Sequence, residues 1–399
     1  MKFVSELELQ LPGLRSLRQD IHANPEASFE EVRTSAIVAK RLRAAGIETH
    51  EGIGNTGVVG VLRGKLPDNG KCIGLRADMD ALRMTEHTGL SYASHRPGVF
   101  HGCGHDGHTT MLMGAAEYLA RTRDFAGTVV FIFQPAEEAI AGAKAMIDDG
   151  LFERFPCTEV YAVHNAPHMK PGQIAVKPGV MLASGDSFEI TVTGIGGHGA
   201  RPHEARDTIS ALGQLIVAVQ TIVSRGVDPM DVAVVSFGTL DAGKAPNVLP
   251  ETAFASGTMR SYNEKTRAFL KTRMAELCEG IGRATGTRID VTFPIGCPAT
   301  FNHPEQAEFA AEVARGIVSP ANVLSDFPAI MASEDFAVML QHRPGAYLLL
   351  GQDGFECHHP KFDFNDDILP IGISLFVRMV EQRLGGTPDM NTETDDHEC

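Results

Sequence analysis

The segment 101–108, with the sequence HGCGHDGH, concentrates residue types that could hold a metal ion. Cys103 and His105 lie two residues apart, so both side chains can point to the same side of an extended or turning backbone. A thiolate and an imidazole are good ligands for zinc and related metals, and the glycines let the chain approach an ion closely. The alternatives are a redox or nucleophilic cysteine and a glycine-rich surface loop. We favour a metal site, because Cys103 has no C-x-x-C partner and further ligands are available elsewhere.

Two acidic residues, Glu137 and Glu138, follow the apolar run 128–133, which is predicted to be a strand covered on both faces. Consecutive side chains point apart, so one carboxylate can bind a metal while its neighbour faces a substrate. Taken alone, the pair would be interpreted as an exposed helix N-terminus, where the helix dipole favours acids.

Histidines at two further places complete a candidate ligand set. His164 ends the predicted buried strand 160–163, and His358 and His359 lie in a late loop. The residues alone do not decide between these last two. One thiolate, three imidazoles and a carboxylate are enough ligands for two ions, with positions left open for water. Open positions are typical of catalytic rather than structural metal sites.

Strands and helices are predicted to alternate along the first part of the chain. The predicted strands are 57–62, 72–77, 128–133 and 160–163, and the predicted helices are 14–46 (interrupted near 24–25), 109–120 and a segment that ends near 149. This alternation indicates an α/β domain with a mixed, mostly parallel sheet flanked by helices. Ligands of such sheets bind at the carboxyl ends of the strands. Polar residues stand at several of these ends, so groups distant in sequence are expected to meet there: Asp78, Asp80, Glu137, Glu138 and His164.

The middle of the chain, residues 184–294, is predicted to be an inserted α+β domain. Its predicted strands are 187–193, 232–237, 253–259 and 288–293, and its predicted helices are 207–224 and 264–285. The first domain is therefore expected in two parts, 1–183 and 295–384; the second part has predicted helices at 304–316, 335–340 and 369–384 and a strand at 346–350. The acidic tail 385–399 has little to bury and is predicted to be mobile.

Composition limits the kinds of partner. A chain of 399 residues suits two domains, and a formal net charge of -15 argues against nucleic acid, which needs a basic face. Seven scattered cysteines suit a reducing compartment. Residues 1–12 lack the apolar core of a signal peptide, and no apolar run approaches the ~20 residues that span a bilayer. We expect a cytoplasmic protein with small-molecule partners and no membrane partner.

The chain resembles the M20 family of metallopeptidases and amidohydrolases. It is most similar to the branch of hippurate hydrolases, N-acyl-amino-acid amidohydrolases and auxin-conjugate hydrolases. The matching stretches span nearly the whole chain: 76–82 (RADMDAL), 101–108 (HGCGHDGH), 134–138 (QPAEE), 164–165 (HN), 196–203 (GGHGARPH), 333–336 (SEDF) and 358–363 (HHPKFD). The resemblance implies a catalytic domain split by an inserted lid and dimerisation domain, and hence a homodimer or higher oligomer formed through that lid.

The resemblance also implies a cofactor of two divalent metal ions per subunit. Cys103 would bridge the two ions, and His105, Glu138, His164 and His358 would complete the ligand set. The family's His-x-Pro pattern favours His358 over its neighbour. Zinc, manganese, nickel and cobalt are all candidates for the metal.

The same resemblance assigns roles to residues outside the ligand set. Glu137 would be the general base, and Asp78 would orient a ligand imidazole. In the lid, His198 would stabilise the oxyanion, either within its own chain or across a dimer interface. Asn247 and Arg260 are the candidates for holding a substrate carboxylate.

The predicted reaction is metal-dependent hydrolysis of the amide bond of an N-acyl-amino acid, such as a benzoyl- or acetyl-amino acid. A dipeptidase or carboxypeptidase of the same family is the alternative within enzymes. A non-catalytic metal-binding or storage protein is the alternative outside them, and Glu137 argues against it because storage needs no base. The sequence does not choose the acyl group, the amino acid or the metal.

Overall fold

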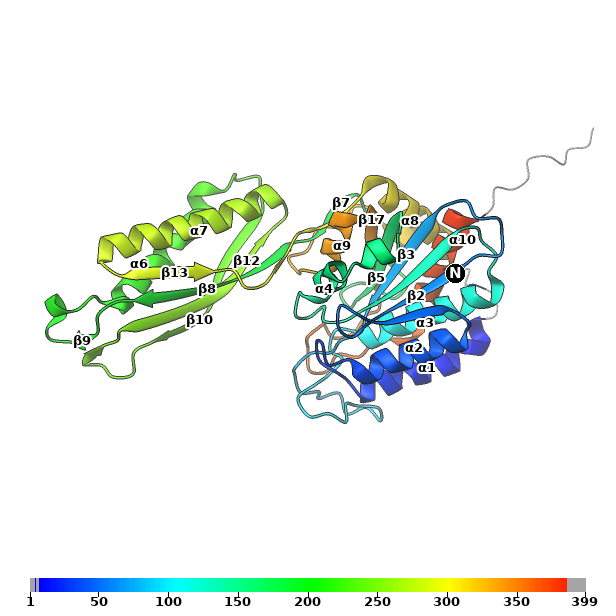
Figure 1. Cartoon of the computed structure of the whole chain (residues 1–399), viewed down its shortest axis with the longest axis horizontal. Helices are drawn as coiled ribbons and strands as arrows, with labels where there is room; N and C mark the ends of the chain where they lie inside the picture. The colour runs from blue at the N-terminus through cyan, green and yellow to red at the C-terminus, as the bar shows by residue number, and fades with distance from the viewer. Residues whose placement is uncertain (1–3, 5–6, 386–399) are drawn as a thin grey trace, which may run out of the picture. The chain divides into compact units, whose positions relative to one another are not determined.

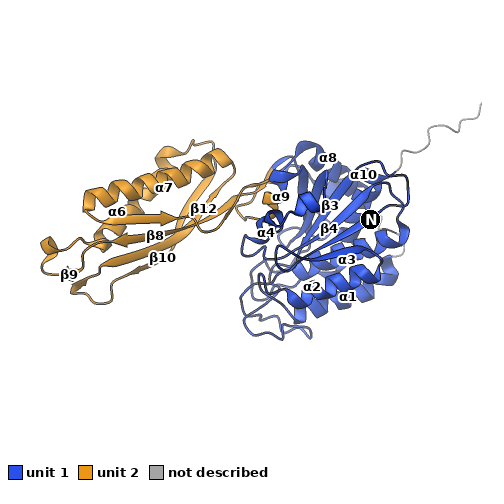
Figure 2. Ribbon diagram, in the orientation of Figure 1, with its two compact units in different colours: residues 1–179, 302–327, 339–399 blue, residues 180–301, 328–338 orange. Residues whose placement is uncertain are grey.

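The computed structural model describes Val4 and residues 7–385, so the predicted mobile tail lies, except for Gly385, outside the described residues. The chain divides into two compact units, drawn blue and orange in Figure 2. The first comprises Met1–Gly179, Asn302–Phe327 and Met339–Cys399, and the second comprises Val180–Phe301 and Pro328–Val338.

The second unit extends beyond the predicted insertion 184–294 and includes residues 295–301 and 328–338, which were expected in the first domain. Strand β14 (Gly296–Cys297) pairs with β8 (Ser184–Thr193) of the second unit. In the later segment, the Ile330 N–H donates to the Met181 carbonyl at 3.0 Å. These pairings are too short to produce a periodic sequence pattern, which is why they were not predicted.

An eight-stranded sheet of order β1-β2-β4-β3-β5-β17-β6-β16 forms the centre of the first unit (Figure 1). Its strands are β1 (Glu48–Ile53), β2 (Gly57–Arg63), β3 (Cys72–Asp78), β4 (Thr128–Gln134), β5 (Glu159–Ala166), β6 (Ile174–Ala175), β16 (Val323–Leu324) and β17 (Gly345–Gly351). The strands β4, β3, β5 and β17 are parallel, and β1 and β2 add antiparallel pairs at one edge. The predicted fold class is confirmed. Strand β1 was not predicted, because its residues are mostly polar and exposed.

Helices flank this sheet (Figure 1). They are α1 (Leu7–Ala23), α2 (Val32–Ala44), α3 (His105–Thr122), α4 (Gly142–Asp148), α5 (Leu151–Arg154), α8 (Pro304–Ile317) and α10 (Leu369–Leu384), with short 3-10 turns at Pro320–Asn322 and Asp366–Ile368. Helix α9 (Phe336–His342) crosses the boundary between the units. Helix α3 begins at His105, earlier than the predicted residue 109, so the end of the HGCGHDGH segment is helical.

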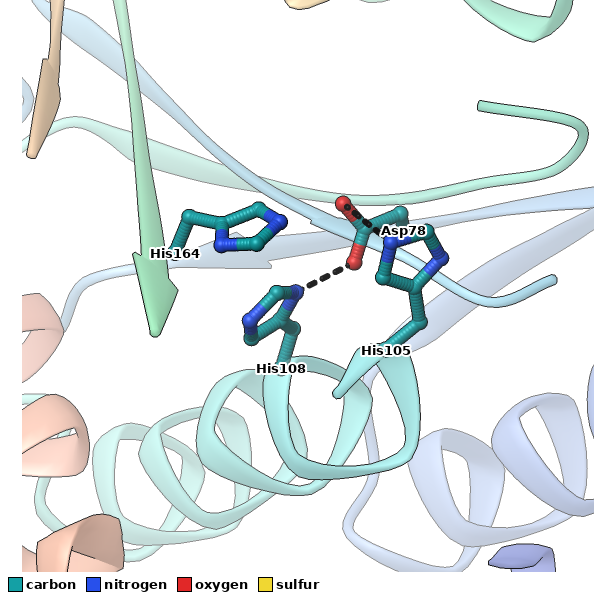
Figure 3. A group of neighbouring side chains, drawn as sticks. All are labelled: Asp78, His105, His108 and His164. Carbon is teal, nitrogen blue, oxygen red and sulfur yellow. Dashed lines mark hydrogen bonds and ion pairs between the residues drawn. The ribbon is translucent and has the colours of Figure 1, made fainter. Parts of the chain in front are cut away.

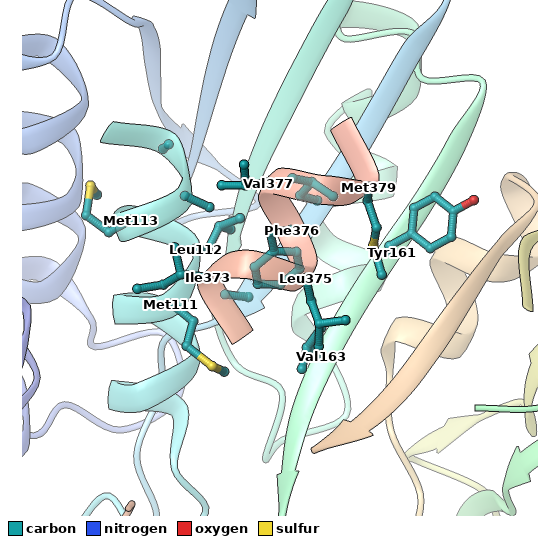
Figure 4. Close-up of a cluster of buried hydrophobic side chains, with 14 of the residues drawn as sticks. Met111, Leu112, Met113, Tyr161, Val163, Ile373, Leu375, Phe376, Val377 and Met379 are labelled. Carbon is teal, nitrogen blue, oxygen red and sulfur yellow. The ribbon is translucent and has the colours of Figure 1, made fainter. Parts of the chain in front are cut away.

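The contact between α3 and α10 fixes the position of the segment that carries Cys103 and His105. Figure 4 shows buried side chains from α3, α10 and β5 packed together. A Cβ on Gly372 of α10 would lie 1.9 Å from the Met111 sulfur of α3, so any larger residue there would displace the Met111 side chain from its place between the two helices. Burial of this kind stabilises by about 25 cal/mol per Å² of apolar surface. The first turn of α3 is therefore held by the core of the unit.

The second unit has an antiparallel sheet of order β10-β12-β8-β13, with β14 also paired to β8. The strands not yet given are β10 (Ala233–Ala242), β12 (Thr252–Ser261) and β13 (Arg288–Thr292), and shorter strands are β7 (Gly179–Leu182), β9 (Gly197–His198), β11 (Val248–Leu249) and β15 (Thr300–Asn302). The helices are α6 (Thr208–Thr221), α7 (Glu264–Thr285) and a 3-10 turn at Pro202–Glu204. Asp207 and Asn263 cap α6 and α7 by accepting hydrogen bonds from N–H groups of the first turn, as expected of N-cap residues.

Residues 208–226 form one continuous helical stretch, because a π-helical turn (Ile222–Gly226) follows α6. By length and composition this stretch alone, among the described residues, could cross a membrane. Its buried face packs on the core of the second unit through Ala211, Leu215 and Val219. Val217, on another face, is 72% exposed.

Candidate metal centre

Polar side chains from three parallel strands and one helix meet at the carboxyl edge of the first unit's sheet. Asp78 is the last residue of β3, Glu137 and Glu138 follow the end of β4, and His164 lies near the end of β5. His105 opens α3. The convergence follows from parallel strands sharing one carboxyl edge.

A thiol, a carboxylate and an imidazole from distant parts of the chain lie within reach of one cation. One ligand atom from each of Cys103, Glu138 and His358 lies within 4.8 Å of the other two. Glu138 Oε1 is 3.4 Å from His358 Nε2 and 3.9 Å from His105 Nε2, and Cys103 Sγ is 3.6 Å from His164 Nε2. Ligand atoms that each lie about 2.0–2.3 Å from a tetrahedral ion are separated by similar distances. The structure thus brings the five predicted ligands together.

Two buried atoms of this group have a free hydrogen-bonding position. Neither His105 Nε2 nor Glu138 Oε1 has a hydrogen-bond partner among the described residues. Buried polar atoms are rarely left this way, because each lost hydrogen bond costs about 1–3 kcal/mol. A thiol, imidazoles and a carboxylate are also the donor set of zinc and its neighbours. The residues present therefore fit divalent cations.

Neighbouring groups fix which ring nitrogen each histidine can offer. His105 Nδ1 lies 3.2 Å from Asp80 Oδ1, which leaves Nε2 facing the ligand group. His164 Nδ1 donates to the Asn165 carbonyl at 2.7 Å, which leaves Nε2 facing Cys103. Carboxylates and carbonyls commonly hold metal-ligating imidazoles in this way.

His108 lies beside His105 and His164, and Figure 3 shows its contact with Asp78. Its neighbours engage both of its ring nitrogens. Nδ1 is 2.6 Å from Asp78 Oδ1, and Nε2 is 2.6 Å from the Asn165 side-chain oxygen. The imidazole therefore supports the site and has no nitrogen left for a metal. Sequence reasoning did not assign it a role, because its position in the HGCGHDGH segment cannot show what its nitrogens touch.

Asp78 contacts more than one imidazole. Its shortest contacts are with His108 and, at 2.8 Å, with Arg76, whereas His105 Nε2 is 3.8 Å away. Burial by itself would raise the pKa of Asp78, but the positive charges of His105, His108 and Arg76 hold that pKa well below its usual range. Asp78 therefore stays ionised in the buried site. The carboxylate that hydrogen-bonds the predicted ligand His105 is Asp80.

The protein environment alone disfavours the thiolate form of Cys103. A hydrogen bond with Cys357, burial, and the negative charges of Glu138 and Glu137 raise the pKa of Cys103 well above the usual value of a thiol. A cation is the group that would reverse this, since a coordinating thiol is deprotonated by the metal's charge. A positive charge among these residues would therefore stabilise the thiolate form of Cys103.

His358 and His359 have different surroundings. His358 adopts a positive φ of 66° and donates its N–H to the Gly102 carbonyl at 2.7 Å, which brings its ring against Glu138. The His359 ring stacks on Phe355 at 4.5 Å and accepts the Lys361 N–H. The geometry therefore favours His358 as the ligand.

Removing a residue that only supports a ligand typically weakens metal binding by about 10–100-fold. We expect His358→Ala, which removes a ligand itself, to weaken it by more than this. His359→Ala is the matched control and is expected to keep the metal affinity of the unmodified protein. Titration of the metal-free protein with zinc measures both. Equal losses in the two variants, or a loss confined to His359→Ala, would contradict this assignment.

The residues predicted for oxyanion and carboxylate binding belong to the second unit. His198 in β9 pairs with Val248 of β11, and the Gly199 N–H donates to the Asn247 carbonyl at 2.8 Å. His198 and Asn247 line the same hollow. Arg260 lies near the end of β12, separated from Asn247 by most of that ten-residue strand, roughly 25 Å at the usual rise per residue. Within one second unit, the structure therefore brings His198 and Asn247 together and leaves Arg260 apart, and their catalytic and binding roles stay predictions.

The fold and this group of potential metal ligands define the class of protein, a hydrolase with a candidate metal site. The chain belongs to peptidase family M20/M25/M40, whose family model matches residues 74–382. Within that family it is an amidohydrolase.

Relatives and a solved structure support this placement. Hippurate hydrolase of Campylobacter jejuni is 42% identical over 381 residues, which cover 95% of this chain and 98% of the relative. N-acetyl-L-cysteine deacetylase of Bacillus subtilis is 37% identical over 383 residues, which cover 96% and 89% of the two chains. The structure of the Bacillus subtilis YXEP protein, described as a dinuclear metal binding peptidase from the M20 family, is similar with a TM-score of 0.80 and 31% identity, covering 94% of this chain and 99% of that one.

Proposed function

We propose that this protein hydrolyses the amide bond of N-acyl-amino acids, with Glu137 as the general base. The observation that carries the proposal is the pairing of two adjacent glutamates that the site uses differently. Glu138 Oε1 lies 3.4 Å from His358 Nε2 and groups with Cys103 and His358. Glu137 is not in that set: it lies near His105 and Glu138 and also groups with Glu334 and Asp335. The similarity to a hippurate hydrolase and to an N-acetyl-L-cysteine deacetylase supports the substrate class.

The ligands for two divalent cations would be Cys103, His105, Glu138, His164 and His358. When bound, such ions supply a Lewis acid and make a water molecule acidic near neutral pH. The thiol and imidazoles suit zinc, cobalt or nickel, and the carboxylate also suits manganese.

The chain's own groups then move the protons. Glu137 takes a proton from the attacking water and returns a proton to the departing amine, which is the usual work of a general base that later acts as an acid. Its side chain is 8% exposed, so bulk water is largely kept from the carboxylate. His198 would stabilise the oxyanion, and Asn247 and Arg260 would hold the substrate carboxylate.

The second unit supports a proposal of assembly into a homodimer or higher oligomer. β10 lies at one edge of its sheet, and edge strands offer unpaired backbone groups to another chain. Large apolar side chains are exposed on the same unit: Val217 at 72%, Met230 at 89% and Leu240 at 59%. Roughly 25 Å separate Asn247 from Arg260 along one chain, so a single carboxylate could meet both only if two chains contribute. A monomer in sedimentation at micromolar concentration would contradict this assembly.

A substrate panel assayed with defined metals tests the function. Activity on N-benzoylglycine and N-acetyl-amino acids is expected to vanish with a chelator and to return with added zinc, manganese, cobalt or nickel. Dipeptides with a free amine are expected to react at least about tenfold more slowly, which corresponds to ~1.4 kcal/mol of the barrier. Unchanged turnover after metal removal, verified by elemental analysis, would refute metal dependence, and faster cleavage of free dipeptides would favour the peptidase alternative.

A further inference from the structure

Asp80 is a buried carboxylate that is not a predicted ligand but contacts both His105 and the turn that carries Glu137 and Glu138. It lies two residues after the end of β3, and its side chain is fully buried. Its oxygen Oδ1 lies 3.2 Å from His105 Nδ1. The same oxygen accepts the backbone N–H of Glu137, and Oδ2 accepts the backbone N–H of Glu138, both at 3.1 Å.

These contacts fix three functional groups through one carboxylate. An N–H donated from His105 Nδ1 leaves the lone pair on Nε2, where the ligand group lies. The two accepted backbone N–H groups belong to consecutive residues, so they set the direction in which the Glu137 and Glu138 side chains leave the main chain. Asp80 uses both of its carboxylate oxygens in these contacts.

A second buried carboxylate holds the same turn from the other side. Glu31, which is fully buried, accepts the Ala136 N–H at 2.9 Å. Ala136 has a positive φ of 51°, a conformation that is uncommon for residues other than glycine. Such a backbone persists only when its surroundings hold it. The turn 136–138 is therefore anchored at each of its three N–H groups, twice by Asp80 and once by Glu31.

We propose that Asp80 is the positioning residue of the site, which sets the tautomer of His105 and the directions of Glu137 and Glu138 together. It touches neither substrate nor metal. Its contribution to kcat rests on the proposed role of Glu137, whereas its contribution to metal affinity does not.

Asp80→Asn tests the proposal with a side chain of the same shape. Whichever way the amide turns, its NH₂ group faces an N–H of residue 137 or 138 and cannot accept from it. We expect metal affinity to fall by about 10–100-fold, and kcat to stay at least about tenfold low when metal is saturating, with KM within about threefold. Ser28→Ala is the matched control: it removes the 2.7 Å hydrogen bond to Asp80 Oδ2 without touching the turn, and both constants are expected to stay unchanged.

A measurement on the unmodified protein covers the case in which Asp80→Asn does not fold. In metal-loaded protein with ¹⁵N-labelled histidine, His105 is expected to carry its proton on Nδ1, protected from exchange with water. A proton on Nε2 would overturn the proposal, as would Asp80→Asn with the metal affinity and kcat of the Ser28→Ala control. If Glu137→Gln keeps full activity while Asp80→Asn loses metal, the proposed base is wrong and the positioning role stands.

Discussion

Replacing Glu137 by glutamine is expected to lower kcat for an N-acyl-amino acid by about 10²–10⁴-fold, the range that a positioned general base contributes. The amide keeps the size of the side chain and cannot accept the proton of the attacking water. Metal content is expected to remain at two ions per chain, because we assign the ligand role to Glu138, which faces His358, and the base role to Glu137. Steady-state kinetics and elemental analysis of the same preparation measure both quantities.

The kinetic pattern separates loss of the base from loss of structure. KM is expected to change little, since a group needed only in the transition state affects kcat and kcat/KM alike. A Glu137→Gln enzyme that retains metal and turns over within tenfold of the unmodified protein would remove Glu137 from the mechanism. A variant that loses metal as well would place Glu137 in the ligand group.

Replacing Cys103 by serine is expected to have the largest effect on the metal centre. Cys103 is the one sulfur donor in the ligand group formed by the described residues, and its sulfur faces both the Glu138–His358 pair and His164. A hydroxyl is a much weaker donor than a thiolate toward zinc or cobalt. We expect metal affinity to fall by more than about 100-fold, beyond the usual effect of a supporting residue, and hydrolysis to be lost at equimolar metal.

Cys357→Ser is the control for this substitution. The Cys357 thiol hydrogen-bonds Cys103 and lies 3.7 Å from the Asn165 side-chain nitrogen, but it belongs to none of the metal-ligand groups among the described residues. This variant is expected to bind metal nearly as well as the unmodified protein. Titration with cobalt, followed by its absorption bands, reports both affinity and sulfur coordination. A sulfur-to-metal band that survives in Cys103→Ser and disappears in Cys357→Ser would reverse the assignment.

Much of the fold could be predicted because its elements carry strong patterns. The runs 128–133 and 160–163, which became the centres of β4 and β5, are continuously apolar, as expected for strands covered on both faces. Helices α7 and α10 match their predicted bounds of 264–285 and 369–384. Strand β1 and the second unit's segments 295–301 and 328–338 were not predicted. Their positions depend on backbone pairing with distant parts of the chain, and such short pairings leave no periodic pattern in the sequence.

The sequence by itself determined which residue types stand at the carboxyl ends of the parallel strands, since apolar runs place those ends and the residues after them are read directly. Only the tertiary structure decided which of these groups face the ligand set and which hold a neighbouring residue in place. His108 has both ring nitrogens engaged by Asp78 and Asn165, His358 faces Glu138 while His359 stacks on Phe355, and Asp80 holds His105. The physical reason is that an imidazole can offer a metal only the nitrogen that its neighbours leave free. Those neighbours come from strands and loops far away in the chain.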